Sequence, residues 1–215
     1  MPPRTKVEIS GRWAAYYDGL MNLFFLGSYP RFIRHVIAKM QIEPGDEILD
    51  LGSGTGRNAR LMLDAIGSTG RIVGVDLSPG MLHRARRRCE PYPQVSFLQQ
   101  RIEHPLPFAE EFDKVFVSFV LHGFEDEDKR RIIANAREAL RQDGSLWILD
   151  YSEFDLDKMW WPLRWLFSRL ECELAREFLK LDLTRMLTES GFGDFSCHQF
   201  IRGYVRLIGA RKQSA

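Results

Sequence analysis

The chain has 215 residues, 45% of them hydrophobic and 27% charged, and a formal net charge of +1. This length and composition suit one globular domain with a sizeable core. The balanced charge excludes the strongly basic surface typical of a nucleic-acid-binding protein, so no nucleic-acid partner is expected. The sequence also lacks a signal-peptide pattern and an apolar run long enough to span a bilayer, and its three cysteines are widely spaced. We therefore expect a cytoplasmic protein with reduced thiols and no metal site.

Helical patterns occupy the N-terminal part of the chain. Residues 13–25 mix aromatic and small side chains at near-helical spacing, and residues 31–40 place apolar side chains on one side of a helix. We expect residues 1–42 to form a helical cap over a ligand site. Most of its aromatic rings suit plain core packing, whereas Tyr16 suits either core packing or contact with a cationic ligand.

A strand followed by a glycine turn comes next. Residues 48–56 read Ile-Leu-Asp-Leu-Gly-Ser-Gly-Thr-Gly, with Asp50 near the strand exit, and a helix is expected over 57–66. Glycines let the backbone approach a ligand closely, and the start of the helix offers unpaired N–H groups. The dinucleotide fingerprint fits poorly, since its last glycine is arginine or alanine here, and the Gly-Lys-Ser/Thr ending of a P-loop is absent.

A second carboxylate follows the second strand. The strand over 72–75 leads into Asp76, which is placed to accept hydrogen bonds from both hydroxyls of a ribose. Ser78 and Pro79 then predict the N-cap and first turn of a helix that runs to Arg88. Its arginines at 84, 86, 87 and 88 indicate a solvated surface, with contact to an anionic lipid as the alternative.

The remaining pattern alternates strands with helices, which predicts a parallel sheet with helices on both faces. The tryptophan-rich helical stretch over 159–170 suits either a hydrophobic lid or an inserted core helix. The other expected elements are strands over 95–98 and 115–121, a helix over 125–141 ended by Asp143-Gly144, a strand over 145–151, a helix over 182–190, and strands over 195–200 and 204–210.

The order of these motifs resembles class I S-adenosylmethionine-dependent methyltransferases. The Asp-x-Gly-x-Gly-x-Gly run is followed by Asp76, by Leu-Pro-Phe at 106–108 and by Gly-Ser-Leu at 144–146. Within that class the chain is most similar to the ubiquinone/menaquinone-biosynthesis C-methyltransferases. The resemblance implies a three-layer Rossmann-like, mostly parallel seven-stranded sheet whose last strand is antiparallel. It also implies one domain with these parts: a cap over 1–42, a cofactor-binding core over 43–151, a lid-like helical insertion over 152–180, and a C-terminal helix and strands over 181–215.

The resemblance further implies that S-adenosylmethionine lies at the carboxyl ends of the strands. Asp50 would lie near its amino group and Asp76 at its ribose. The acidic residue that often precedes Leu-Pro in the family is replaced here by Gln100-Arg101-Ile102, so a backbone carbonyl or packing would hold the adenine. The full set of expected cofactor contacts is Tyr16, Asp50, Gly52, Ser53, Gly54, Gly56, Asp76, Leu77, Met81, Arg101, Ile102 and Phe119.

Methyl transfer from a sulfonium is an in-line displacement in which alignment and exclusion of water supply much of the rate. A carbon or phenol acceptor must in addition lose a proton. The candidate bases are His122, just past the central strand, and Asp150 and Tyr151, at the end of the next strand. Histidine suits proton transfer near neutral pH. For His122 a surface or supporting role is the alternative, and the other four histidines are expected to be structural.

The leading hypothesis is therefore a methyltransferase that acts on a hydrophobic small molecule such as a quinone precursor. Two alternatives stay open. One is N- or O-methylation of a phospholipid headgroup or soluble metabolite, with peripheral membrane contact through the arginines and tryptophans. The other is a regulator that binds the cofactor without catalysing transfer. A dehydrogenase is a remote further alternative.

Overall fold

The computed structural model describes residues 28–154 and 173–214. The predicted helices over 13–25 and 159–170 lie outside these residues, and so does Tyr16. The described part of the expected cap contains one helix, α2 (Tyr29–Lys39), and the described end of the expected insertion contains α7 (Glu173–Phe178).

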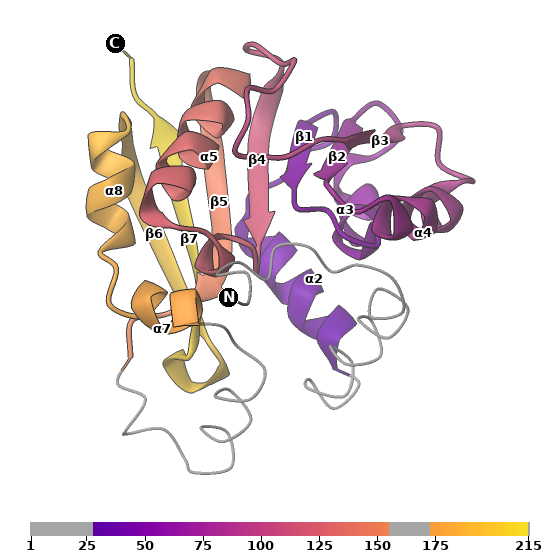
Figure 1. Cartoon of the computed structure of the whole chain (residues 1–215). Helices are drawn as coiled ribbons and strands as arrows, with labels where there is room; N and C mark the ends of the chain where they lie inside the picture. Colours follow the sequence, from indigo (N-terminus) through magenta and orange to yellow (C-terminus); the bar gives the residue numbers. More distant parts are fainter. Residues whose placement is uncertain (1–27, 155–172, 215) are drawn as a thin grey trace.

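A seven-stranded sheet forms the centre of the molecule (Figure 1). Its strand order is β3-β2-β1-β4-β5-β7-β6. β7 runs antiparallel to both of its neighbours, and the other paired strands are parallel, which confirms the predicted sheet with an antiparallel last strand. The strands are β1 (Glu47–Leu51), β2 (Arg71–Asp76), β3 (Val95–Gln99), β4 (Phe112–Ser118), β5 (Leu140–Tyr151), β6 (Phe192–Phe200) and β7 (Val205–Lys212).

Helices cover both faces of the sheet, so the predicted three layers are confirmed (Figure 1). The other helices are α3 (Arg57–Ile66), α4 (Pro79–Cys89), α5 (Asp126–Ala139), α8 (Leu183–Glu189) and the short 3-10 helices η1 (Leu121–Gly123) and η3 (Ile201–Gly203). α2 and α3 share one core layer with the sheet, and α5 and α8 share the other. Within the described ranges, no helix is long and apolar enough to cross a membrane.

The two core layers explain why the central strand is apolar without alternation. Successive residues of a strand point to opposite faces, and Phe116 and Val117 of β4 accordingly belong to different layers. Both are at most 1% exposed. A strand covered on both faces needs apolar residues at consecutive positions, as the sequence of β4 indicates.

The helix that follows the second carboxylate begins as predicted. The Oγ of Ser78 accepts a hydrogen bond from the backbone N–H of Met81 at 3.4 Å, and Pro79 occupies the first turn. The helix after the glycine turn, α3, also has its predicted bounds.

Several predicted boundaries were wrong. The strand expected over 115–121 ends at Ser118, because Phe119 takes a positive φ of 53° and turns the chain into η1. The helix expected over 125–141 ends at Ala139, where Leu140 is already extended. Asp143-Gly144 therefore lies inside β5 instead of ending a helix, and β5 is longer than the predicted strand over 145–151.

The topology brings the candidate residues to one edge of the sheet. β1, β2, β4 and β5 are parallel, so their carboxyl ends meet there. Open α/β sheets bind their ligands outside this edge.

Candidate active site

The three glycines of the turn have different surroundings. Gly52 and Gly56 have φ values of +76° and +70°, and an added Cβ would lie 2.4 Å from a Val120 methyl or 2.9 Å from the Ala85 Cβ. Gly54 also has a positive φ, +54°, but a Cβ there would meet no described heavy atom within 4 Å. Packing thus requires the outer two glycines, whereas the middle one has no such neighbour among the described residues.

Asp76 ties the glycine turn to the loop that follows β2. Its Oδ2 accepts a hydrogen bond from the N–H of Gly54 at 2.9 Å, and its Oδ1 accepts one from the N–H of Ser78 at 2.8 Å. Burial raises the pKa of Asp76, and these N–H groups partly oppose that shift. The backbone N–H of Leu77 opposes the shift as well. Since the two carboxylate oxygens have four lone pairs between them, the group retains capacity to accept a further hydrogen bond.

Asp50 is the most unusual carboxylate of this edge. It is 1% exposed, and neither of its oxygens has a hydrogen-bond partner among the described residues. Burial, and then the nearby charge of Asp76, raises the pKa of Asp50 to about 7. A buried carboxylate without a donor costs free energy, so this position favours a ligand that brings a cation or several N–H donors.

The other expected cofactor contacts are distributed around this edge. Met81 and Ile102 are buried. The carbonyl of Leu77 accepts a hydrogen bond from Gln99 at 3.3 Å, and the carbonyl of Ile102 accepts one from Asn135 at 2.8 Å. Phe119 has its strained positive φ where β4 ends, a conformation that costs free energy in a residue other than glycine.

Arg101 is paired with the next acidic residue of the chain. Its Nε donates a hydrogen bond to Glu103, which is only 7% exposed. The segment before Leu106 therefore does contain a buried carboxylate, placed later than the family pattern led us to expect.

His122 and Asp150 form the closest contact between candidate catalytic groups. The Nδ1 of His122 lies 2.7 Å from Oδ1 of Asp150, and the backbone N–H of His122 donates to Oδ2 at 3.2 Å. The backbone N–H of Tyr151 donates to Oδ1 at 2.8 Å. Asp150 is 1% exposed, so these contacts hold a buried carboxylate against the imidazole.

Aromatic rings surround this pair. The Tyr151 ring lies 4.9 Å from the His122 ring and 5.9 Å from the Phe119 ring, and Phe178 of α7 lies 6.5 Å from His122. The structure thus brings together the three predicted bases, His122, Asp150 and Tyr151. Phe178 was missed by the sequence analysis, because only the tertiary fold places α7 against η1.

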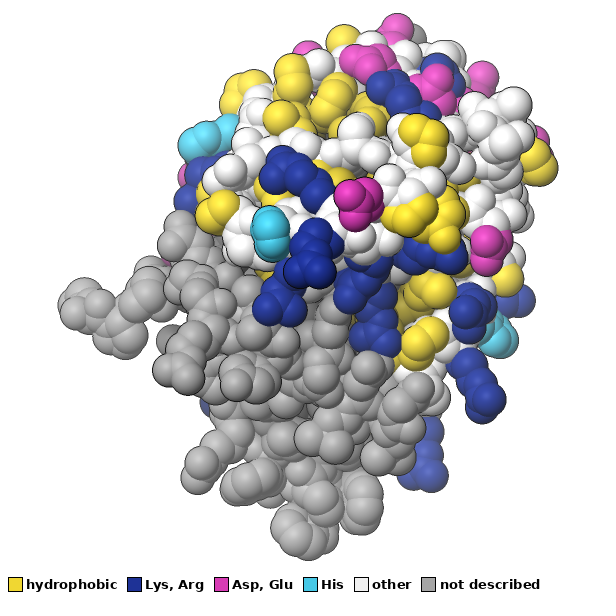
Figure 2. Space-filling view, turned by 90° about the vertical axis from the view of Figure 1, so that its right-hand side faces the viewer, with side chains coloured by type: hydrophobic (Ala, Val, Ile, Leu, Met, Phe, Trp, Pro, Cys, Tyr) yellow, Lys and Arg dark blue, Asp and Glu magenta, His cyan; other side chains and the backbone are white. Residues whose placement is uncertain are grey.

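The arginine run of α4 divides into two parts. The arginines at 84, 86 and 87 are exposed, as the solvated-surface prediction requires. Figure 2 shows the side of the molecule that is on the right in Figure 1, where α4 lies, and Lys and Arg side chains gather across this face. Arg88 differs, because its Nη1 donates to the backbone carbonyl of Thr55 at 2.6 Å and so binds the glycine turn.

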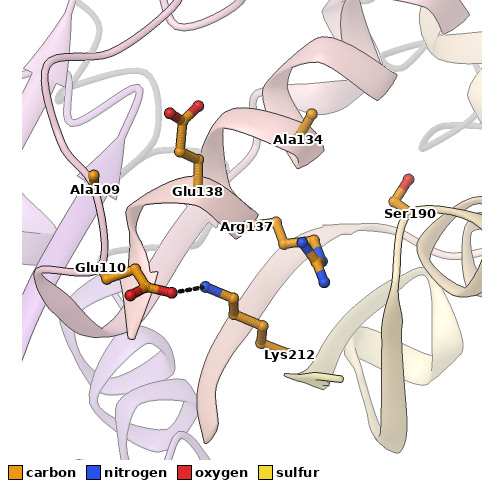
Figure 3. Close-up of a pocket in the computed structure, with 7 residues that line it drawn as sticks. All are labelled: Ala109, Glu110, Ala134, Arg137, Glu138, Ser190 and Lys212. Atoms are coloured by element: carbon orange, nitrogen blue, oxygen red, sulfur yellow. Dashed lines mark hydrogen bonds and ion pairs between the residues drawn. The ribbon is translucent and has the colours of Figure 1, made fainter. Parts of the chain in front are cut away.

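A hollow of about 410 Å³ lies at the opposite edge of the sheet (Figure 3). It is near the amino end of β4, and α5 lines one side. The Nζ of Lys212 donates to the carbonyl of Leu140 at 2.6 Å and to Glu110 at 3.2 Å. Lys212 is thus paired with a carboxylate, and the hollow is remote from the groups described above.

Known proteins resemble the chain over most of its length. Residues 48–144 match the family described as methyltransferase domain. An uncharacterized methyltransferase from Synechocystis sp. is 32% identical over 187 residues, which cover 86% of this chain and 85% of that protein. The chain belongs to the class I S-adenosylmethionine-dependent methyltransferases. S-adenosylmethionine is accordingly its cofactor.

A second relative bears on the subgroup of this methyltransferase. The ubiquinone/menaquinone biosynthesis C-methyltransferase UbiE from Xanthomonas campestris pv. campestris is 33% identical over 154 residues. The match covers 70% of this chain and 60% of that relative. The fold also agrees with that of a SAM-dependent methyltransferase from Aquifex aeolicus, with a TM-score of 0.64, 17% identity, and 83% and 88% of the two chains covered.

The two carboxylates near the strand exits are acceptors that fit this cofactor, whose ammonium group and ribose hydroxyls are donors. The buried carboxylate of Asp50 lacks a partner within the described part of the chain, as a site for an ammonium group would. Asp76 retains acceptor capacity next to Gly54, where no described heavy atom lies within 4 Å of an added Cβ.

Proposed function

We propose that this methyltransferase transfers the methyl group to a carbon or a phenolic oxygen of a hydrophobic aromatic acceptor, such as a quinone precursor. The observation that carries the proposal is the 2.7 Å contact between His122 and Asp150 beside the rings of Tyr151 and Phe178. An acceptor that loses a proton needs such a base, and aromatic walls suit a flat apolar molecule. The quinone C-methyltransferases among the relatives support the same class.

The cofactor is held, in this proposal, by the exits of β1 and β2. Asp50 binds the ammonium group, and Asp76 accepts hydrogen bonds from the ribose hydroxyls. When bound, the cofactor supplies a methyl group on a sulfonium that is already activated for displacement. The supporting contacts are those predicted from the sequence, namely Tyr16, Gly52, Ser53, Gly54, Gly56, Leu77, Met81, Arg101, Ile102 and Phe119.

His122 acts as the general base. Since the Asp150 carboxylate accepts the hydrogen of Nδ1, the lone pair of the imidazole is on Nε2, and Nε2 takes the proton from the acceptor. Asp150 then stabilises the imidazolium by charge. The backbone N–H groups of His122 and Tyr151 fix the carboxylate so that the imidazole stays oriented.

The test is methyl transfer from methyl-labelled S-adenosylmethionine to a series of hydroxylated aromatics of increasing hydrophobicity. We expect His122→Gln to lower kcat by about 10²–10⁴ because the proton acceptor is lost. Asp150→Asn should lower it as well, with S-adenosylhomocysteine affinity unchanged in both. The control is His104→Gln, an exposed histidine away from the pair. Wild-type kcat in the His122 variant would refute the assigned base, and absence of transfer to every aromatic would refute the acceptor class.

A peripheral membrane contact fits the same proposal, since a hydrophobic acceptor partitions into lipid. The exposed arginines at 84, 86 and 87 supply the positive charge that anionic headgroups attract.

A further inference from the structure

Arg206 is a buried cation at the edge of the sheet where the acceptor would bind. It lies at the start of β7, and its register partner on β5 is Asp150. Directly paired residues of an antiparallel ladder point to the same face, so the side chains of Arg206 and Asp150 share one face of the sheet. Arg206 is 9% exposed.

Only part of the hydrogen-bonding capacity of the Arg206 guanidinium is used by the described residues. Its Nη1 donates to Oε1 of Glu153 at 2.8 Å. Its Nε and Nη2 are buried and have no hydrogen-bond partner in residues 28–154 and 173–214. Burying charged donors without acceptors is costly, so a fold retains such an arrangement where a ligand completes it.

The two open donors form one edge of the guanidinium. Nε–H and the adjacent N–H of Nη2 are parallel, which is the side-on fork that receives a carboxylate or a phosphate through two hydrogen bonds. Asp150 already accepts from the N–H and Nδ1 of His122 and from the N–H of Tyr151. The His122–Asp150 pair and the unpaired Nε and Nη2 donors of Arg206 are therefore separate groups at the same edge of the sheet.

We propose that Arg206 binds an oxyanion of the methyl acceptor, a carboxylate or a phosphate, through Nε and Nη2. The inference rests on the proposed function, since it assumes that the acceptor lies beside His122 and Asp150. It narrows the acceptor to an aromatic molecule that carries a negative group. That group would place the ring relative to His122, so Arg206 is a positioning and specificity residue.

Calorimetry on the protein saturated with S-adenosylhomocysteine tests this with three probes: benzoate, phenyl phosphate and the neutral benzamide. We expect one or both anions to bind with a lower Kd than benzamide. Arg206→Gln should raise the Kd of the anions about tenfold or more, the size expected from losing charge-assisted hydrogen bonds, and leave that of benzamide unchanged. The preferred anion then distinguishes carboxylate from phosphate.

The matched control is Arg211→Gln, which removes the same charge from an exposed position further along β7. Arg206→Lys keeps the charge but loses the fork, so it should recover only part of the affinity. Melting temperatures and S-adenosylhomocysteine affinity check that each variant is folded. Equal binding of anions and benzamide, no anion binding up to roughly 10 mM, or equal effects of the Gln variants at 206 and 211 would overturn the proposal. Each of these results leaves cofactor binding and the role of His122 intact, so failure here differs from failure of the proposed function.

Discussion

At the scale of single residues, the buried carboxylate of Asp50 lowers the stability of the ligand-free protein when it is ionised. Asp50 is buried with a pKa of about 7, against 3.8 for an ordinary aspartate, so the folded protein holds this proton more tightly than the unfolded chain. Its contribution to the free energy of unfolding is therefore greatest below pH 4, falls as pH rises toward 7, and stays low above that. The ionised carboxylate, which the proposed contact with the ammonium group requires, therefore forms at a cost in stability.

The substitution Asp50→Asn should separate the effect of the Asp50 charge on stability from its effect on cofactor binding. At pH 8 the ligand-free variant should be more stable than wild type by up to a few kcal/mol, because the buried charge is gone, with little difference near pH 4. Its S-adenosylhomocysteine affinity at pH 8 should fall about tenfold or more. Denaturant unfolding at both pH values and calorimetry measure this. A variant that is less stable at pH 8 and binds normally would contradict the assignment of Asp50.

At the scale of elements, the glycine turn combines packing and binding within a few residues. The sequence predicted the strand, the turn and α3, because glycine spacing and apolar runs are local signals. It could not predict that Gly52 packs on Val120, because that contact depends on where β4 ends. The sequence analysis also placed the end of β4 too far along the chain, because an apolar run does not reveal the positive φ of Phe119.

Two alanine substitutions in this turn should have different effects. Gly52→Ala places a Cβ 2.4 Å from a Val120 methyl, so it should destabilise the protein by about 2–4 kcal/mol, combining positive-φ strain with overpacking. Gly54→Ala meets no described atom within 4 Å, so its cost should be only that of the positive φ, about 1 kcal/mol, while cofactor affinity falls.

Thermal unfolding and calorimetry of both variants check this difference. Val120→Ala should relieve part of the cost in the Gly52→Ala background, because it removes the methyl groups in conflict. Equal destabilisation by the two alanines, with cofactor affinity unchanged in Gly54→Ala, would show that the turn has no open ligand side.

At the scale of the whole molecule, the fold concentrates its reactive groups at one edge. Asp50, Asp76 and Asp150 each lie within the last two residues of a parallel strand there, and η1 adds His122. The seven-stranded sheet and its antiparallel last strand were predictable through the family resemblance, and the candidate site residues were chosen from their positions near strand exits. Arg206 was not, because its burial and its open donors arise from the pairing of β5 with β7.

A crystal structure of the protein with S-adenosylhomocysteine tests the central claim most directly. The account predicts ribose hydroxyls within about 2.6–3.2 Å of the Asp76 carboxylate, the ammonium group beside Asp50, and the sulfur facing the edge that carries His122. A nucleoside bound elsewhere, for example in the hollow beside Lys212, or bound without contact to either carboxylate, would contradict it.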